Sequence, residues 1–101
     1  MTDGELVAFA SDFREGILDG RSSEWACAMV CWPLSSLLRH HGVECECVES
    51  DLGHCNHVWI RLADGRALDP TADQFNHFND CDFPPVYLGA PAVIHPMEKA
   101  A

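Results

Sequence analysis

Hydrophobic side chains recur every three or four positions near the start of the chain, which is the spacing of one face of an α-helix. These positions are Leu6, Phe9, Ala10, Phe13 and Ile17. Thr2 and Glu5 precede them with the spacing of a capping box, in which each side chain accepts the backbone N–H of the other residue. Gly20 suits the end of the helix, and the polar residues 21–24 suit a turn. The pattern therefore predicts a first amphipathic helix.

A second helical pattern runs from Cys27 to His41, and Gly42 follows it as a left-handed cap. Its hydrophobic face comprises Val30, Cys31, Leu34, Leu37, Leu38 and His41. Pro33 falls inside this pattern, where it removes one backbone hydrogen bond unless it belongs to the first turn of the helix. The helix therefore begins either at Cys27 or close to Pro33, and the pattern leaves both starts open.

Three later segments alternate between apolar and polar side chains with the period of a β-strand. Residues 43–47 alternate apolar with acidic side chains, and residues 57–62 follow after a loop. Asp64–Gly65 is typical of a hairpin turn, after which residues 66–69 form the antiparallel return strand. Two helices followed by these strands predict an α+β fold, in which both N-terminal helices pack on an antiparallel β-sheet.

The chain after Pro70 is predicted to be irregular, with Phe75, Phe78 and Phe83 as its anchors. A last extended piece covers residues 86–88, and the prolines around it favour an extended or edge conformation over a helix.

The loop length of the hairpin decides which side chains meet across it. A two-residue loop at Asp64–Gly65 would pair Ile60 with Asp69 and place a carboxylate on the apolar face. A three-residue loop at 63–65, with glycine in the left-handed position, pairs Ile60 with Leu68 instead. We predict the second register, because only this one keeps apolar side chains opposite apolar ones. A slip of one residue would turn the whole strand over and move its apolar side chains to the other face.

In this register His57 and Asp69 lie diagonally on one face, about 7 Å apart between Cα atoms, so that their side chains can meet. A carboxylate in that place would fix the tautomer of the imidazole and stabilise its charged form, as a catalytic histidine requires. A cysteine at a helix N-terminus near a histidine is favoured as the thiolate. Cys27 opens the second helix and is therefore the candidate nucleophile for this pair.

The order of these pieces resembles the transglutaminase-like branch of the papain-like cysteine enzymes. The matching pieces are Cys27 with the Leu37–Gly42 helix end, His57-Val58-Trp59, Leu68-Asp69-Pro70-Thr71 and the following Ala72–Phe75. The resemblance covers residues 22–75 and extends to small uncharacterised bacterial and phage proteins of this type. It implies a minimal papain/transglutaminase-like core as a single domain of residues 1–101. It also implies a catalytic triad of Cys27, His57 and Asp69, and it names no substrate.

Two positions depart from the family pattern and keep a second nucleophile open. The nucleophile follows Trp25–Ala26, where the family often has small residues, and Pro33 lies inside the helix. If the helix began near Pro33, Cys31 and Trp32 would stand at its start, as in the Cys-Trp dipeptide of papain. The family spacing of fifteen residues before the helix-ending glycine favours Cys27, whereas the chemistry of proline favours Cys31.

Composition limits the classes of partner and the compartment. The net charge is −10, with 16 acidic against 6 basic residues, so binding to nucleic acid or to an anionic membrane surface is disfavoured. No apolar run reaches the length that spans a bilayer, and the acidic start lacks the features of a signal peptide. We therefore expect a cytoplasmic protein, in which the six cysteines are buried residues, metal ligands or nucleophiles rather than disulfides.

The remaining cysteines and histidines have plainer interpretations. Cys45 and Cys47 share one strand face with Val43 and are predicted core residues, as is Cys31, whereas Cys55 and Cys81 have no assignment. A zinc site could combine Cys45, Cys47, Cys55 and His54 or His57, but this spacing matches no common zinc module. His40, His41, His77 and His95 are predicted to be surface or capping residues.

The sequence therefore predicts a thiol-dependent hydrolase, a peptidase, isopeptidase or amidase that forms a thioester on Cys27 and needs no metal or organic cofactor. Its expected substrate is a peptide or protein, and a chain this short is compatible with a homodimer that completes the cleft. Three alternatives stay open: an acyltransferase of the transglutaminase kind with the same triad, a non-catalytic binding module, and a zinc-binding domain.

Overall fold

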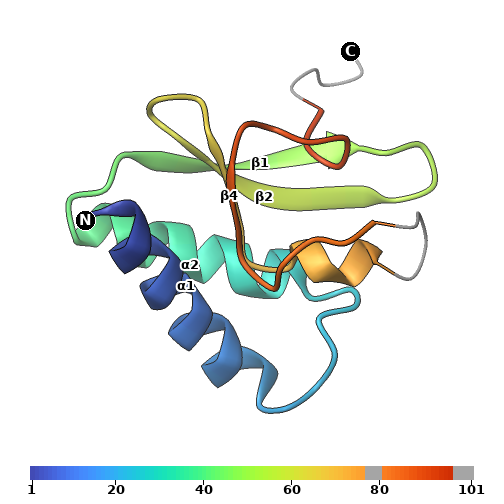
Figure 1. The fold of residues 1–101 in the computed structure, drawn as a ribbon, viewed down its shortest axis with the longest axis horizontal. Helices are drawn as coiled ribbons and strands as arrows, with labels where there is room; N and C mark the ends of the chain where they lie inside the picture. Colours follow the sequence, from blue (N-terminus) through green and yellow to red (C-terminus); the bar gives the residue numbers. More distant parts are fainter. Residues whose placement is uncertain (77–80, 97–101) are drawn as a thin grey trace.

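The computed structural model describes residues 1–76 and 81–96. The elements are α1 (Asp3–Leu18), α2 (Cys27–His40), β1 (Cys45–Asp51), β2 (Asn56–Leu62), β3 (Ala67–Asp69), the 3₁₀ helix η1 (Ala72–Phe75) and β4 (Tyr87–Gly89). The four strands form one antiparallel sheet in the order β1-β2-β3-β4, and both α-helices lie on one side of it (Figure 1). The predicted α+β layout is confirmed. The region after Pro70 is more regular than expected, because it contains η1.

Helix α1 begins at the predicted capping box. Thr2 is the N-cap: its hydroxyl accepts the N–H of Glu5 at 3.1 Å, and the Glu5 carboxylate accepts the N–H of Thr2 at 2.8 Å. The helix ends at Leu18, where Asp19 adopts the left-handed conformation with a φ of 50°. Gly20, the predicted end, follows with a φ of 80°.

Helix α2 begins at Cys27, so the alternative start near Pro33 is wrong. Pro33 lies in the helix interior on its exposed side. The carbonyl that would have bonded its missing N–H belongs to Met29, a residue that is 50% exposed, so water can satisfy this oxygen. Gly42 takes the predicted left-handed cap conformation, with a φ of 85°.

The sheet has the predicted hairpin register. Ile60 pairs with Leu68, and the N–H of Leu62 donates to the carbonyl of Arg66 at 2.9 Å, which closes a three-residue loop. Gly65 occupies the left-handed position of that loop, with a φ of 89°. Strand β1 starts and ends later than predicted: it runs to Asp51, because every residue of β1 finds a partner along β2.

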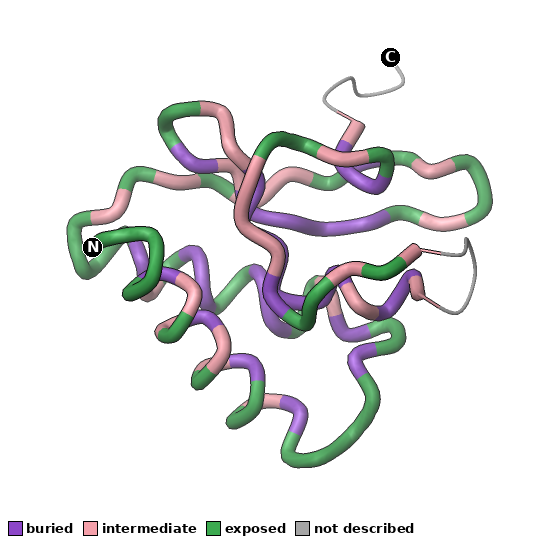
Figure 2. The backbone as a smooth tube through the Cα atoms, in the orientation of Figure 1, coloured by how far each residue is buried: buried purple, intermediate pink, exposed green. Residues whose placement is uncertain are grey.

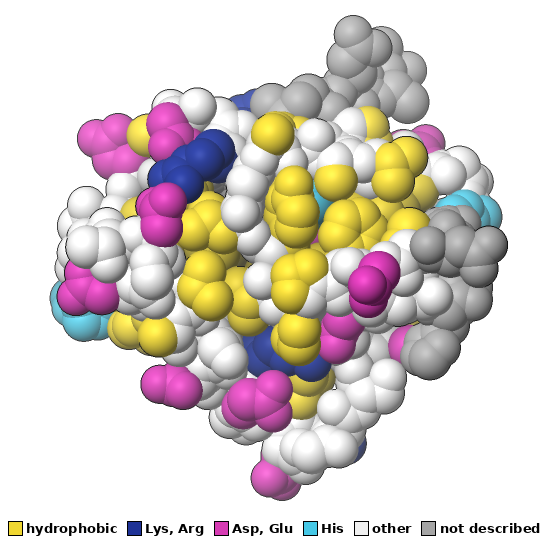
Figure 3. All heavy atoms as spheres, viewed as in Figure 1, with side chains coloured by type: hydrophobic (Ala, Val, Ile, Leu, Met, Phe, Trp, Pro, Cys, Tyr) yellow, Lys and Arg dark blue, Asp and Glu magenta, His cyan; other side chains and the backbone are white. Residues whose placement is uncertain are grey.

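The main core fills the space between the helices and the sheet, where the buried parts of both layers face each other (Figure 2). Its members are Leu6, Ala10, Cys31, Leu34, Leu38, Val58, Ile60, Leu62, Leu68 and Val86. Cys45 and Cys47 pack against this core, as predicted. A smaller cluster of Ala72, Phe75 and Ile94 draws the segments on either side of β4 together. On the face shown in Figure 3, Asp and Glu side chains are spread around a central group of hydrophobic ones.

Strand β2 pairs with β1 along its whole length, but the short third strand leaves part of the other edge of β2 unpaired. Beyond the pair of Ile60 and Leu68, the same register would bring Val58 opposite Pro70. Proline has no N–H for the ladder, so pairing stops at Asp69. The backbone of Val58 is thereby open to helix α2, and the thiol of Cys31 donates to its carbonyl at 3.3 Å.

Candidate active site

His57 and Asp69 form a hydrogen bond in the fully buried part of the sheet. Nε2 of His57 lies 2.6 Å from Oδ2 of Asp69, and both side chains have no exposed surface. His57 comes from β2 and Asp69 from the end of β3, so the predicted diagonal pair is brought together. The hairpin register positions both groups.

The environment favours opposite charges on these two residues. Burial alone would raise the pKa of Asp69, but hydrogen bonds from His57 and His95 lower it to about 2. Burial would lower the pKa of His57, but the bond to Asp69 and an interaction with Cys27 raise it to about 9. The pair is therefore a carboxylate bound to an imidazolium at neutral pH.

The backbone after β3 fixes the other carboxylate oxygen. Oδ1 of Asp69 accepts the N–H of Thr71 at 3.0 Å across Pro70, a turn geometry typical of aspartate. The hydroxyl of Thr71 in turn accepts a hydrogen bond from Nε2 of Gln74 at 2.8 Å. The sequence Asp69-Pro70-Thr71 thus both ends the strand and orients the carboxylate.

His95 is a buried member of this cluster, so its predicted surface or capping role is wrong. Its side chain has no exposed surface, and its Nε2 lies 2.7 Å from Oδ2 of Asp69, the same oxygen that binds His57. Its ring also lies against Trp59 and Tyr87, with centroid separations of 5.0 and 5.3 Å. The C-terminal segment brings His95 back over the sheet from 26 residues further along the chain.

Cys27 is the first residue of α2 and lines a pocket of about 100 Å³. The pocket is lined by Glu24, Trp25, Cys27, His54, Cys55, Asn56, Gln74 and Phe75. Burial would raise the pKa of the Cys27 thiol, but the His57 side chain and the backbone N–H groups of Val58 and Ala28 together lower it. The thiol therefore ionises more readily than an ordinary cysteine.

Unlike His57 and Asp69, Cys27 and His57 are not joined by a hydrogen bond of regular geometry, so the structure does not bring the predicted triad fully together. Among the described residues, Nδ1 of His57 is buried and makes no hydrogen bond of regular geometry. Since Nε2 is engaged by Asp69, Nδ1 is the nitrogen that remains for the interaction with the Cys27 thiol. Such contacts are often long in the absence of substrate and tighten when it binds.

The start of α2 supplies a partly positive environment. The N-cap residue, Ala26, has no side-chain oxygen to accept the first N–H groups, and the first turn contains no acidic residue. These N–H groups carry the positive end of the helix dipole, which stabilises an anion placed there. Cys27 stands at that position.

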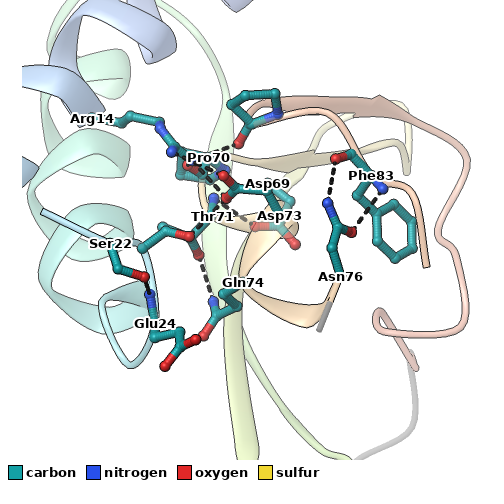
Figure 4. A network of polar contacts seen from close by, with 12 residues as sticks. Arg14, Ser22, Glu24, Asp69, Pro70, Thr71, Asp73, Gln74, Asn76 and Phe83 are labelled. Atoms are coloured by element: carbon teal, nitrogen blue, oxygen red, sulfur yellow. Dashed lines mark hydrogen bonds and ion pairs between the residues drawn. The ribbon is translucent and has the colours of Figure 1, made fainter. Parts of the chain in front are cut away.

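A buried arginine of α1 binds the turn after Asp69 (Figure 4), and Asp73 of that turn also binds Ser23, shortly before α2. Arg14 of α1 binds both carboxylate oxygens of Asp73, at 2.8 and 3.0 Å, and donates to the carbonyls of Pro70 and Pro85, each at 3.0 Å. The hydroxyl of Ser23 donates to the same Asp73 carboxylate at 2.8 Å. Because Ser23 shortly precedes Cys27, this network holds the helix start against the turn.

The main core between the helices and the sheet contains Cys31, and Cys45 and Cys47 pack against it. Burial raises the pKa of Cys31 well above its ordinary value, so this thiol stays neutral. The thiols of Cys45 and Cys47 make hydrogen bonds to Ser35 of α2. Among the described residues, the proposed zinc set of these two cysteines with Cys55 and a histidine does not come together.

One group in the described part of the chain has donor atoms of the metal-binding kind within 4.8 Å of one another: His57, Asp69 and His95. Two imidazoles and a carboxylate suit zinc or iron. The separations of 2.6 and 2.7 Å between their atoms are hydrogen-bond lengths, and both bonds end on one oxygen. We therefore interpret the group as a hydrogen-bonded cluster.

The remaining histidines lie away from the cluster or outside the described residues. His40 and His41 are exposed at the C-terminal end of α2, as predicted. His54 lines the pocket beside Cys27. The predictions for His77 and Phe78 fall on residues outside the described ranges.

Comparison with protein-family models, with curated proteins and with solved structures found no match to this chain. In residues 1–76 and 81–96, neither helix has the length and apolar character needed to cross a bilayer.

Proposed function

We propose that the protein is a thiol-dependent hydrolase in which Cys27 is the nucleophile, His57 the general base and acid, and Asp69 the group that orients His57. One observation carries the proposal. The buried imidazole of His57 is bound through Nε2 to the Asp69 carboxylate, and its Nδ1 has no hydrogen-bond partner among the described residues. The same imidazole lowers the pKa of the Cys27 thiol, which lines the pocket at the uncapped start of α2.

The proposed reaction has two stages. The Cys27 thiolate, paired with a His57 imidazolium that already holds the proton, attacks the carbonyl carbon of an amide. The C–N bond then breaks, the amine leaves with the proton from His57, and a thioester remains on Cys27. His57, now neutral, takes a proton from a water molecule, whose oxygen attacks the thioester; the C–S bond breaks, a carboxylic acid leaves, and the thiolate–imidazolium pair is restored. The Cys27 N–H at the helix start would stabilise the oxyanion, for which one donor contributes about 3 kcal/mol.

The pocket supports a peptide or protein amide as the substrate class. Aromatic side chains of Trp25 and Phe75 stand beside Cys27, next to the polar groups of Asn56 and Gln74. Sites of mixed apolar and polar lining suit a side chain attached to an amide. With a net charge of −10, nucleic acid is a poor substrate. If an amine replaced water in the second stage, the same residues would catalyse acyl transfer.

A reducing compartment such as the cytoplasm is part of the proposal. Cys27, Cys31, Cys45, Cys47 and Cys55 are free thiols. A nucleophilic thiol must stay reduced to act, and reducing conditions keep it so.

The proposal is tested by timed alkylation with iodoacetamide at pH 6, followed by mass spectrometry of each cysteine. We expect Cys27 to react at least about tenfold faster than the other thiols, because its thiolate is stabilised. His57→Gln should abolish this advantage, whereas His40→Gln, at an exposed position, should keep it. Equal, slow labelling of all cysteines would overturn the proposal, as would stoichiometric zinc in elemental analysis of the purified protein.

A further inference from the structure

A second histidine shares the acceptor oxygen of the proposed triad. Nε2 of His57 and Nε2 of His95 lie 2.6 and 2.7 Å from Oδ2 of Asp69, and all three side chains are fully buried. None of the proposed chemical steps uses His95. Burial of a polar side chain costs free energy unless it is hydrogen-bonded, and both ring nitrogens of His95 have partners.

The hydrogen bonds of His95 determine its tautomer. Its Nδ1 accepts the backbone N–H of Ala92 at 3.0 Å, so this nitrogen carries no proton. Nε2 must then carry the ring proton and donate it to Asp69. His95 is therefore a neutral donor, and Asp69 keeps its negative charge for His57.

The segment that carries His95 is fastened to the sheet independently of Asp69. The N–H of His95 donates to the carbonyl of Ala92 at 2.9 Å, which closes a turn. The next residue, Pro96, accepts a hydrogen bond from the hydroxyl of Ser50 at 2.7 Å, and that hydroxyl accepts the indole N–H of Trp59 at 2.9 Å. Strands β1 and β2 thus both hold the donor in place.

We propose that His95 is a positioning residue, which holds Oδ2 of Asp69 against His57 and so keeps the triad histidine oriented toward Cys27. The inference rests on the proposed triad. The carboxylate has a donor on each side: Thr71 fixes Oδ1, and His95 fixes Oδ2. Without the second donor, the Asp69 side chain is free to turn about its bond to the backbone, and His57 loses a fixed partner.

The test compares His95→Gln with His95→Asn in the full chain. The amide nitrogen of glutamine reaches the place of Nε2, whereas that of asparagine reaches only the place of Nδ1. His40→Asn, at an exposed position, is the control. The measurements are the low-field NMR signal of the His57 Nε2 proton, the alkylation rate of Cys27 at pH 6, and the thermal midpoint.

Positioning predicts that His95→Gln keeps the low-field signal and alkylates within about twofold of the parent protein. It predicts that His95→Asn loses the low-field signal and that its Cys27 is alkylated about tenfold more slowly. A rise of about one in the pKa of Cys27 would have this effect. If both variants behave alike and change only the thermal midpoint, His95 has a purely structural role and the inference is wrong. If Cys27 is slow in the parent protein, the proposed function fails, while the NMR signal still decides the role of His95.

Discussion

Cys27 and Cys31 lie one helical turn apart on α2, yet their thiols have opposite character. Both interact with the backbone of Val58. The Cys31 thiol donates to the Val58 carbonyl at 3.3 Å, whereas the Val58 N–H lowers the pKa of Cys27. Burial raises the pKa of Cys31 well above its ordinary value, while the pKa of Cys27 is lowered. The difference arises because the His57 side chain lowers the pKa of Cys27 at the start of the helix, whereas Cys31 is more deeply buried and gains no such effect.

The first prediction separates these two cysteines by mutation. Cys27→Ala should remove the fast-alkylating site and leave the thermal midpoint almost unchanged, since this residue is only partly buried. Cys31→Ala should keep the fast site but destabilise the fold by about 1–2 kcal/mol, because it leaves a small cavity and an unbonded carbonyl. Alkylation kinetics and thermal unfolding of both variants measure this. A fast site that disappears in Cys31→Ala would make Cys31 the nucleophile.

Local patterns predicted those parts of the fold that depend on neighbours in sequence. The capping box of Thr2 and Glu5 is satisfied within four residues. The register of Ile60 and Leu68 follows from the loop length and from the need to keep one face apolar. The pairing of His57 with Asp69 then follows from that register, and for this reason this part of the candidate site could be predicted.

The sequence could not reveal contacts that are made by a distant segment. His95 meets Asp69 only because the residues after β4 cross back over the sheet, and no periodicity in that proline-rich stretch indicates such a path. Pro33 favoured the alternative start of α2, which is wrong, whereas the family spacing favoured Cys27. Proline favours a helix start, but an exposed position in the helix interior tolerates it, because the orphaned carbonyl can reach water.

The second prediction concerns the carboxylate of the cluster. Asp69→Asn keeps the shape of the side chain but removes the charge that holds His57 as an imidazolium. The pKa of His57 should fall toward its ordinary value, and alkylation of Cys27 at pH 6 should slow by about tenfold or more. NMR titration of the His57 ring and alkylation kinetics measure the two effects. Asp12→Asn, at an exposed position of α1, is the matched control and should change neither.

The third prediction is a stability optimum between about pH 4 and pH 6.5. The pKa of Asp69 is about 2 in the folded protein against an ordinary 3.8, so the unfolded chain binds more protons and stability falls as the pH drops through this interval. The pKa of His57 is about 9 against 6.5, so the folded protein binds more protons there, and stability falls as the pH rises from 6.5 to 9.

Thermal unfolding from pH 2.5 to pH 9.5 measures this profile. The loss of stability at acidic pH and the loss at alkaline pH both arise largely from the ion pair of His57 and Asp69. Asp69→Asn should therefore reduce both losses together. A variant that kept the loss at alkaline pH would show that another group, and not His57, titrates with folding.

The fourth prediction concerns backbone strain close to Cys27. Trp25 has a φ of 62°, a left-handed conformation that is rare for a bulky residue, and its side chain is 77% exposed although it lines the pocket with Cys27. Trp25→Gly should relieve about 1 kcal/mol of strain and raise the thermal midpoint by about 4 °C. Trp25→Ala removes the same indole but keeps the strained backbone, so its midpoint should stay close to that of the parent protein. Since both variants lose the aromatic wall of the pocket, the difference between their midpoints isolates the strain. Equal midpoints for the two variants would show that the backbone at position 25 stores no strain, and that the left-handed turn costs nothing to the fold.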